Sequence, residues 1–457
     1  MTGLARLSAL LDVAYDLQTV ILRPLIVVIL VLSCFSDVLP RAIAQYTPDP
    51  GCTAGQAWNM QTNSRTDPSG KNNIDFPLQQ ATYWATQLTG SSGDIVTIHG
   101  QYPAARYMAL QIYDYNRNVL SALRDDAIDP DSGQVNPYRP GGGSAQGTYT
   151  VQLIFRPGPL RGPASNTLYA GRTQSIILLY RIYYSNNPDD LTGGTSSPVL
   201  PTLTVAGATL TTCAPRPIIS PLSSTVWGRL EQNNFAGVAP SLTLPASNPP
   251  MWFLEATSGS TNFFPSQDNS YMSAFLSRRY LSPPYRYNLA VMRMRAPTFT
   301  DTQNGIPPYA NADMRFWSVC TDEPVATGVT RCISDDMAAN VGGFVTFVIS
   351  DPVAKPSDSV LNKWGAEWLA WGALASGDSI YDARGNVMTN ASGPYYYNAV
   401  LYRQTVSSPA FAASITNVSA LPRQQAQSAM GDYWPQLGYC ALQDFETVGP
   451  GCLGLQQ

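Results

Sequence analysis

The chain has few of the residues that carry charge and acid–base chemistry. Among its 457 residues there is one histidine, His99, and charged residues make up 13%. Because the net charge is −4, the sequence offers no basic field to hold a phosphate backbone or an anionic membrane surface, and we expect no nucleic-acid partner. A nucleophile paired with a histidine base would have to use His99. Since His99 lies in a predicted strand beside Gly100, we expect a partly exposed strand residue instead.

Long helices are also disfavoured by the composition. Glutamate is scarce, whereas the chain holds 35 glycines, 37 prolines and 25 tyrosines, a mixture that favours turns and strands. Residues 94–114 alternate apolar and polar side chains in two runs joined by a turn, which is typical of paired strands. Further strands are predicted at 149–155, 176–184 and 200–205, in the rhythm of a β-sandwich.

The first 44 residues resemble a targeting segment and are set apart from the fold. Leu25–Phe35 form an apolar run too short to span a bilayer comfortably, and Ala42-Ile43-Ala44 supplies a small-residue cleavage site. We therefore expect a signal peptide at 1–44 and a secreted or extracellular protein. The long region before the apolar run carries Asp12 and Asp16, so an uncleaved signal anchor, the one expected contact with a membrane, stays an alternative.

Cleavage after this segment leaves an even number of cysteines in an oxidising compartment, which indicates three disulfides. Two pairs of cysteines are separated by the same short interval, and a third pair brackets the first half. The predicted bonds are Cys52–Cys213, Cys320–Cys332 and Cys440–Cys452. A zinc site is a weaker interpretation, because the chain has no Cys-x-x-Cys and one histidine.

The second half of the chain repeats, in the same order, sequence segments similar to those of the first half, which indicates an internal duplication. The ordered matches are 106–110 with 315–319, 123–126 with 333–336, 149–154 with 344–349, 168–171 with 369–372, and 179–181 with 401–403. The predicted fold is all-β, with two tandem jelly-roll-like antiparallel β-sandwich domains and few short helices.

The domain boundaries follow from this repeat. We expect the first β-sandwich at 45–213, a linker or surface excursion at 214–245, and the second β-sandwich at 246–457. Pro422–Met430, with proline in the first turn and Gly431 after the end, is the best helix candidate. The last disulfide would close the tail behind it.

The repeated segments resemble the domain of unknown function 1214 family. In the first copy the segments that carry the resemblance are Tyr107–Leu110 leading to Tyr113-Asp114, Asp129–Gly133, Asn166–Leu168 and Tyr180–Tyr183. In the second they are Trp317–Val319, Glu367–Leu369 and Tyr402-Arg403. Tyr169 and Ala370 stand where the family has proline, and Glu367 replaces asparagine. The resemblance implies a β-sandwich in an envelope or secreted protein, and it implies no catalytic residues.

An acidic stretch after the predicted strand pair at 94–114 is the candidate metal site. Asp126, Asp129 and Asp131, with Asp125 and Asn136 beside them, offer the oxygen ligands that calcium prefers. The same residues suit a hairpin turn, which is the simpler interpretation. No other cofactor is expected.

Carboxylates beside aromatic residues are the one candidate for catalysis. Glu231, Glu255 and Glu367 lie in apolar settings that could raise their pKa for acid–base cleavage of a polysaccharide. Asn390 and Asn417 begin acceptor sequons for N-glycosylation. The sequence specifies no reaction. We expect a non-catalytic secreted or cell-surface protein that binds a ligand, a glycan or a protein partner; the alternatives are a carboxylate-dependent polysaccharide hydrolase and a structural envelope protein.

Overall fold

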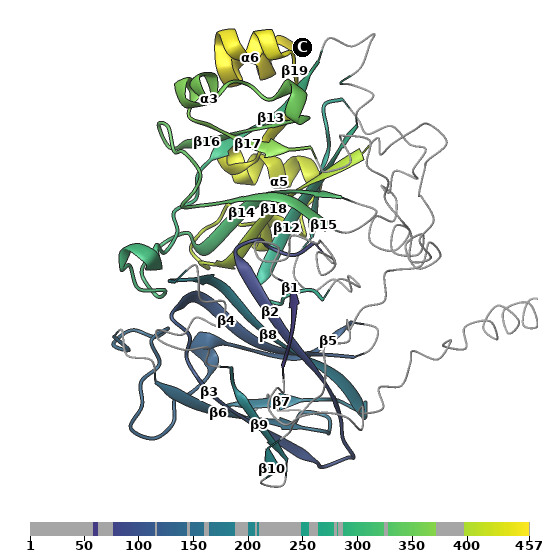
Figure 1. Ribbon diagram of the computed structural model, residues 1–457, viewed down its shortest axis with the longest axis vertical. Helices are drawn as coiled ribbons and strands as arrows, with labels where there is room; N and C mark the ends of the chain where they lie inside the picture. Colours follow the sequence, from purple (N-terminus) through teal and green to yellow (C-terminus); the bar gives the residue numbers. More distant parts are fainter. Residues whose placement is uncertain are drawn as a thin grey trace, which may run out of the picture. The chain divides into compact units, whose positions relative to one another are not determined.

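Strands dominate the computed structural model, and they form four sheets (Figure 1). The structure describes residues 58–62, 76–114, 117–143, 147–159, 164–187, 200–205, 208–209, 248–255, 264–277, 281, 287–323, 328–371 and 397–456. All of them belong to the unit Thr53–Gln457. The expected signal peptide at 1–44 and the expected linker at 214–245 lie outside these residues.

The first sandwich consists of two five-stranded sheets. In spatial order one sheet holds β1 (Asn59–Thr62), β2 (Ala81–Thr89), β8 (Ser175–Ser185), β4 (Ala105–Tyr113) and β5 (Val119–Arg124). The other holds β10 (Ala208–Thr209), β9 (Thr202–Val205), β3 (Ile95–Gln101), β6 (Thr148–Ile154) and β7 (Thr167–Tyr169). The strands pair antiparallel except β6 and β7, which are parallel.

The second sandwich has the same plan. One sheet holds β11 (Trp252–Glu255), β12 (Asn269–Ser277), β18 (Tyr397–Ser407), β14 (Met314–Glu323) and β15 (Gly328–Ser334). The other holds β17 (Ala366–Ala370), β16 (Phe344–Ser350), β13 (Leu289–Arg295) and β19 (Gln436–Cys440), and β16 and β17 again pair in parallel. The all-β sandwich fold expected from the sequence is confirmed.

Strands at equivalent places carry the segments that match in the sequence. The five pairs of segments fall on β4 and β14, at the ends of β5 and β15, on β6 and β16, at the ends of β7 and β17, and on β8 and β18. No described sheet mixes strands from before and after 214–245. The two sandwiches therefore share one topology, strand for strand, apart from the short β10.

Both faces of the central strands are buried, which is unusual for an antiparallel sandwich with one face in water. Every residue of β4 is buried, and so is every residue of β8 except its two ends. Met108 and Leu110 face the core of the first sandwich, whereas Tyr107 and Ala109 belong to a cluster that also includes Phe316 of the second. The outer face of this sheet thus packs against the other sandwich.

The helices are short and lie mainly in the second half. They are α3 (Asp358–Trp364), α4 (Ile415–Val418), α5 (Arg423–Met430) and α6 (Leu442–Val448), with 3-10 turns at η1 (Asp125–Ala127), η3 (Thr302–Asn304), η4 (Pro352–Ala354), η6 (Gly431–Tyr433) and η7 (Gly449–Gln456). The helix predicted after Pro422 is confirmed, with Gly431 at its C-terminal cap. Among the described residues, no helix has the length and apolarity needed to cross a membrane.

Two of the three predicted disulfides are present. Cys320 on β14 and Cys332 on β15 face one another across neighbouring strands, with their Cα atoms 4.0 Å apart. Cys440 at the end of β19 is bonded to Cys452 in the tail. Cys52 and Cys213 lie outside the described residues. Both bonds suit an oxidising, extracellular compartment.

Candidate functional site

The two sandwiches meet where the β1-β2-β8-β4-β5 sheet packs against the β11-β12-β18-β14-β15 sheet, and this contact is called the seam below. Its apolar part joins Tyr107, Tyr183 and Tyr184 of the first sandwich to Phe316 and the Cys320–Cys332 disulfide of the second. Its polar part is built from arginines, tyrosines, aspartates and one asparagine. The residues concerned are Tyr83, Arg106, Tyr113, Asp125, Arg181, Asn269, Tyr271, Arg315, Asp335 and Arg403.

Two buried ion pairs cross the seam in a reciprocal arrangement. Arg106 Nη1 lies 2.5 Å from Asp335 Oδ1, and Arg315 Nη1 lies 2.5 Å from Asp125 Oδ1. Arg106 and Arg315 occupy matching places on β4 and β14, and the two aspartates occupy matching places after β5 and β15. Each sandwich therefore gives its arginine to the aspartate of the other, as the subunits of a symmetric dimer do.

The second oxygen of each aspartate is bound within its own sandwich. Asp125 Oδ2 accepts a hydrogen bond from the amide of Met108 at 2.8 Å, and Asp335 Oδ2 accepts one from the amide of Trp317 at 2.9 Å. Burial raises the pKa of Asp335 to about 7 although Arg106 opposes the shift, and burial likewise raises the pKa of Asp125 against the effect of Arg315. These carboxyl groups carry a desolvation cost that the arginines offset in part.

A second reciprocal pair of contacts lies nearer the centre of the seam. Arg181 Nη2 donates to the carbonyl of Phe264, and Arg403 Nη2 donates to the carbonyl of Phe76 at 3.0 Å. Phe76 and Phe264 lie the same distance before β2 and β12, and both have positive φ, 51° and 50°. A non-glycine residue adopts such a φ at a cost of order 1–3 kcal/mol. In both sandwiches a residue with a strained backbone conformation thus offers its carbonyl group to the arginine of the opposite sandwich.

Tyrosines surround these two arginines. Arg181 Nη2 donates to Tyr113 Oη at 2.7 Å and Arg181 Nη1 donates to Tyr183 Oη at 3.3 Å. The guanidinium of Arg403 lies 5.4 Å from the ring centre of Tyr271, a cation–π distance. Arg181 and Arg403 are both 3% exposed. Burial lowers the pKa of Arg403, but the neighbouring tyrosines, Tyr271 foremost, outweigh burial and the pKa is raised.

Several donor groups of these arginines lack a partner. Nε of Arg181, and Nε and Nη1 of Arg403, are buried and meet no hydrogen-bond acceptor among the residues that the structure describes. Each buried donor without an acceptor costs about 1–3 kcal/mol, and more for a charged group. The seam therefore holds unused, positively charged N–H groups among tyrosine rings.

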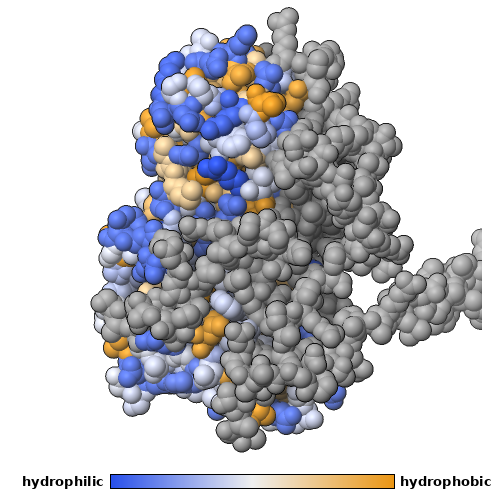
Figure 2. Space-filling view, in the orientation of Figure 1, coloured by the Kyte–Doolittle hydropathy of each residue, from blue (hydrophilic) through white to orange (hydrophobic). Residues whose placement is uncertain are grey.

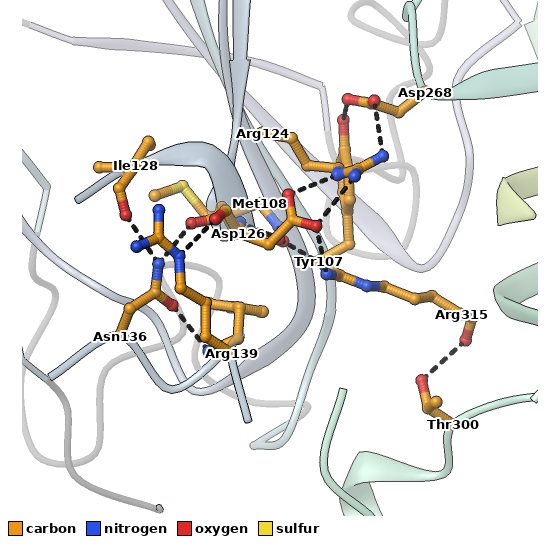
Figure 3. Close-up of polar contacts among 12 residues, drawn as sticks. Tyr107, Met108, Arg124, Asp126, Ile128, Asn136, Arg139, Asp268, Thr300 and Arg315 are labelled. Atoms are coloured by element: carbon orange, nitrogen blue, oxygen red, sulfur yellow. Dashed lines mark hydrogen bonds and ion pairs between the residues drawn. The ribbon is translucent and has the colours of Figure 1, made fainter. Parts of the chain in front are cut away.

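The acidic stretch predicted as a calcium site does not have that arrangement (Figure 3). Asp126 is paired with Arg124 at 2.7 Å, and Arg315 lies 3.6 Å from its other oxygen. Asp129 is paired with Arg139 at 2.8 Å. Cationic partners thus occupy the oxygen atoms that calcium would need.

Asp131, the third predicted ligand, is also apart from the others. It lies 3.6 Å from His99 Nδ1. Within the described part of the chain, no group of three or more His, Cys, Asp or Glu side chains is placed to hold a metal ion. The calcium site at Asp126, Asp129 and Asp131 therefore stays a prediction, and the arginines paired with two of these carboxylates lend it no support.

Of the glutamates predicted as a catalytic set, the two that the structure describes are not brought together. Glu231 lies outside the described residues, and Glu255 is at the end of β11, an edge strand. Glu367 lies on β17, at an edge of the other sheet, next to β15 and thus opposite the edge formed by β11. Burial raises the pKa of Glu367. One half-buried carboxyl group without a second beside it does not form the pair that glycoside cleavage requires.

His99 and Asn417 have ordinary surroundings. His99 is exposed on β3, and its Nδ1 lies 3.2 Å from Thr150 Oγ1. Asn417 is exposed on α4, where its side-chain amide donates to the carbonyl of Phe411 at 3.0 Å. Asn390 lies outside the described residues.

The visible outer surface offers no comparable concentration of chemistry. On the face shown in Figure 2, hydrophobic residues of the described part form small, separate groups among hydrophilic ones. The large hydrophobic side chains that are most exposed, Val353, Leu455 and Val341, lie on η4, on η7 and in the turn before β16. Such scattered residues are normal for a protein surface and need no partner. The seam is the stronger candidate site.

Comparisons with known proteins assign the chain no family and no activity. No family model and no curated protein matches the chain. An uncharacterised protein from Burkholderia cenocepacia is 12% identical over 85% of this chain and 83% of its own, with a TM-score of 0.47. The VPA0106 protein from Vibrio parahaemolyticus is 11% identical over 82% of this chain and 94% of its own, with a TM-score of 0.38. The resemblance to the domain of unknown function 1214 family stays a prediction.

Proposed function

We propose that this protein is an exported, non-catalytic binding protein that holds an oxygen-rich ligand, such as a glycan, at the seam between its two sandwiches. The observation that carries the proposal is the set of buried guanidinium N–H groups on Arg181 and Arg403 that meet no acceptor among the described residues. Hydroxyl, carbonyl or carboxylate oxygens of a ligand would satisfy these donors. The disulfides support export, because such bonds persist in oxidising compartments.

The aromatic residues of the seam suit the same class of ligand. Tyr83, Tyr113, Tyr183 and Tyr271 are arranged around the two arginines, and their rings can pack on the apolar face of a sugar while their hydroxyl groups bond to it. Because the guanidinium groups are buried, the two sheets must separate locally to admit a ligand. We therefore expect slow association, below about 10⁵ M⁻¹s⁻¹.

Thermal-shift and calorimetric titrations against neutral oligosaccharides and against uronic-acid oligosaccharides test the proposal. We expect at least one class to stabilise the wild-type protein. The R403Q variant should lose affinity roughly tenfold or more, because it lacks the charged donors. Arg295 pairs with Asp432 on the surface at 3.0 Å, so R295Q is the matched control and should bind as wild type does.

Two results would overturn the proposal. One is the absence of binding by the folded wild-type protein to every member of both panels. The other is undiminished affinity in R403Q. Should R403Q fail to fold, R403K keeps the buried charge but loses the planar fork of donors, and it should still weaken binding.

A structural envelope protein is the second candidate, and the reciprocal ion pairs favour it. Arg106–Asp335 and Arg315–Asp125 fasten the sandwiches without any ligand, which suits a rigid building block. Such a protein would self-associate, so sedimentation of the purified chain over a range of concentrations separates the two candidates. A monomer that binds saccharide supports the binding protein, whereas concentration-dependent assembly without saccharide binding supports the envelope protein.

A further inference from the structure

Arg181 and Arg403 occupy matching positions on β8 and β18, and the acceptors around Arg181 are all uncharged. Arg181 Nη2 donates to Tyr113 Oη at 2.7 Å and to the carbonyl of Phe264. Its Nη1 donates to Tyr183 Oη at 3.3 Å. Within the described part of the chain, no carboxylate forms an ion pair with Arg181.

The second sandwich has a carboxylate where the first has the tyrosine. In the register of β4 against β8, Tyr113 lies four residues beyond the partner of Arg181. In the register of β14 against β18, Asp322 lies four residues beyond the partner of Arg403. Side chains four residues apart on a strand point to the same face, so Tyr113 and Asp322 share the seam face with their arginines. Asp322 interacts electrostatically with Arg403, whereas Tyr113 gives Arg181 a neutral hydroxyl.

The centre of the seam therefore carries unequal charge. Two guanidinium groups, each on a residue 3% exposed, stand against the single carboxylate of Asp322, which is 1% exposed. A buried charge without a counter-ion is costly, because the protein interior solvates it far less well than water does. Nε of Arg181 is also a buried donor with no acceptor among the described residues. Both costs fall on the side of Arg181, where a bound anion would offset them.

We propose that the ligand of the seam is an acidic saccharide, and that its carboxylate is the counter-ion of Arg181. This assignment rests on the binding function proposed above and narrows its ligand class to sugars such as uronic acids. The carboxylate would accept the unused Nε–H of Arg181, and a hydrogen bond between two charged groups is stronger than one to a neutral hydroxyl. A neutral sugar would accept the same proton but would leave the excess positive charge in place.

Uronic-acid oligosaccharides and their methyl esters are a matched pair of probes, because esterification removes the charge and leaves the sugar rings unchanged. Calorimetric titration of the full chain at pH 7 should show that the wild type binds the acid about tenfold or more tightly than the ester. R181Q should bind acid and ester about equally, since it lacks the uncompensated charge. R295Q, which alters a surface pair with Asp432, is the control and should keep the wild-type preference.

The outcomes separate this assignment from the binding function. Equal affinity of the wild type for acid and ester would overturn the assignment of the anion, while the seam would still bind a saccharide. Failure of every saccharide, acidic or neutral, to bind would overturn the binding function and the anion with it. A preference for the acid that persists in R181Q would show that the carboxylate binds elsewhere.

A second variant covers the case in which R181Q does not fold. D322N removes the carboxylate near Arg403 and leaves two uncompensated guanidinium groups at the centre of the seam. The ratio of acid to ester affinity should therefore rise above that of the wild type. An unchanged or smaller ratio would contradict the assignment.

Discussion

The reciprocal ion pairs make a direct prediction about how stability depends on pH. Asp335 has a pKa of about 7 in the folded protein, raised by burial from 3.8. Its side chain is fully buried and faces Arg106. Because the folded state holds this proton more tightly than the unfolded state, the contribution of Asp335 to stability is fully present below pH ~4 and is lost as the pH rises to about 7.

The expected size of the effect follows from the shift. Three pKa units correspond to about 4 kcal/mol, since each unit is worth about 1.4 kcal/mol. The D335N variant carries no titrating group at this position and keeps one acceptor oxygen, which can serve either Arg106 or the amide of Trp317. The stability of D335N relative to wild type should therefore rise by about 4 kcal/mol between pH 4 and pH 8.

Urea unfolding of both proteins at a series of pH values measures this difference. Contributions from other titrating groups cancel when the two curves are subtracted. Asp432 has a side chain 62% exposed and pairs with Arg295 on the surface, so D432N is the control for the loss of a surface carboxylate. Parallel curves for D335N and wild type would refute the reasoning, because they would mean that Asp335 has the same pKa in both states. D125N should show the same sign as D335N, since burial also raises the pKa of Asp125.

Three further predictions concern the second sandwich. Replacing both Cys320 and Cys332 by alanine should lower the free energy of unfolding, measured by denaturant titration, by about 3 kcal/mol, because the disulfide closes a short loop. An unchanged denaturation midpoint would contradict the pairing. S357A should cost about 1 kcal/mol in the same assay, since the Ser357 hydroxyl caps α3 by accepting from the Val360 amide; no change would mean that this cap is unimportant. G365A should destabilise the protein more than S357A, because Gly365 has a φ of 56° and an added Cβ would lie 2.2 Å from a Val341 methyl group. A decrease in the thermal midpoint no larger than that of S357A would contradict this.

Local pattern was enough to predict the strands and the tail. The apolar and aromatic run at 176–184 predicted a strand that the structure places at Ser175–Ser185, and proline and glycine at the ends predicted α5. The equal spacing of four cysteines predicted two disulfides that are present. These features depend on residues close in sequence or on a repeated interval, which is why the sequence alone reveals them.

The seam could not be predicted in the same way. The ordered matches aligned Arg106 with Arg315, and Arg181 with Arg403, as equivalent positions of the two copies. They did not show that the arginine of one copy binds a group of the other, because such contacts join residues as much as 327 positions apart. The same reason applies to Asp126, which meets Arg315 only after both sandwiches have folded. The sequences of β4 and β8 did carry one indication of the seam. Apolar and tyrosine residues lie on both faces of these strands, which predicts that both faces are packed.

The unused guanidinium donors of the seam are predicted to hold an oxygen-rich ligand. A crystal structure of the protein with a saccharide selected from the titration panel tests it most directly. We predict ligand oxygen atoms at hydrogen-bond distance from Nε of Arg181 and from Nε or Nη1 of Arg403, with a sugar face against Tyr271. A saccharide bound elsewhere, with the seam closed and unchanged, would contradict the claim.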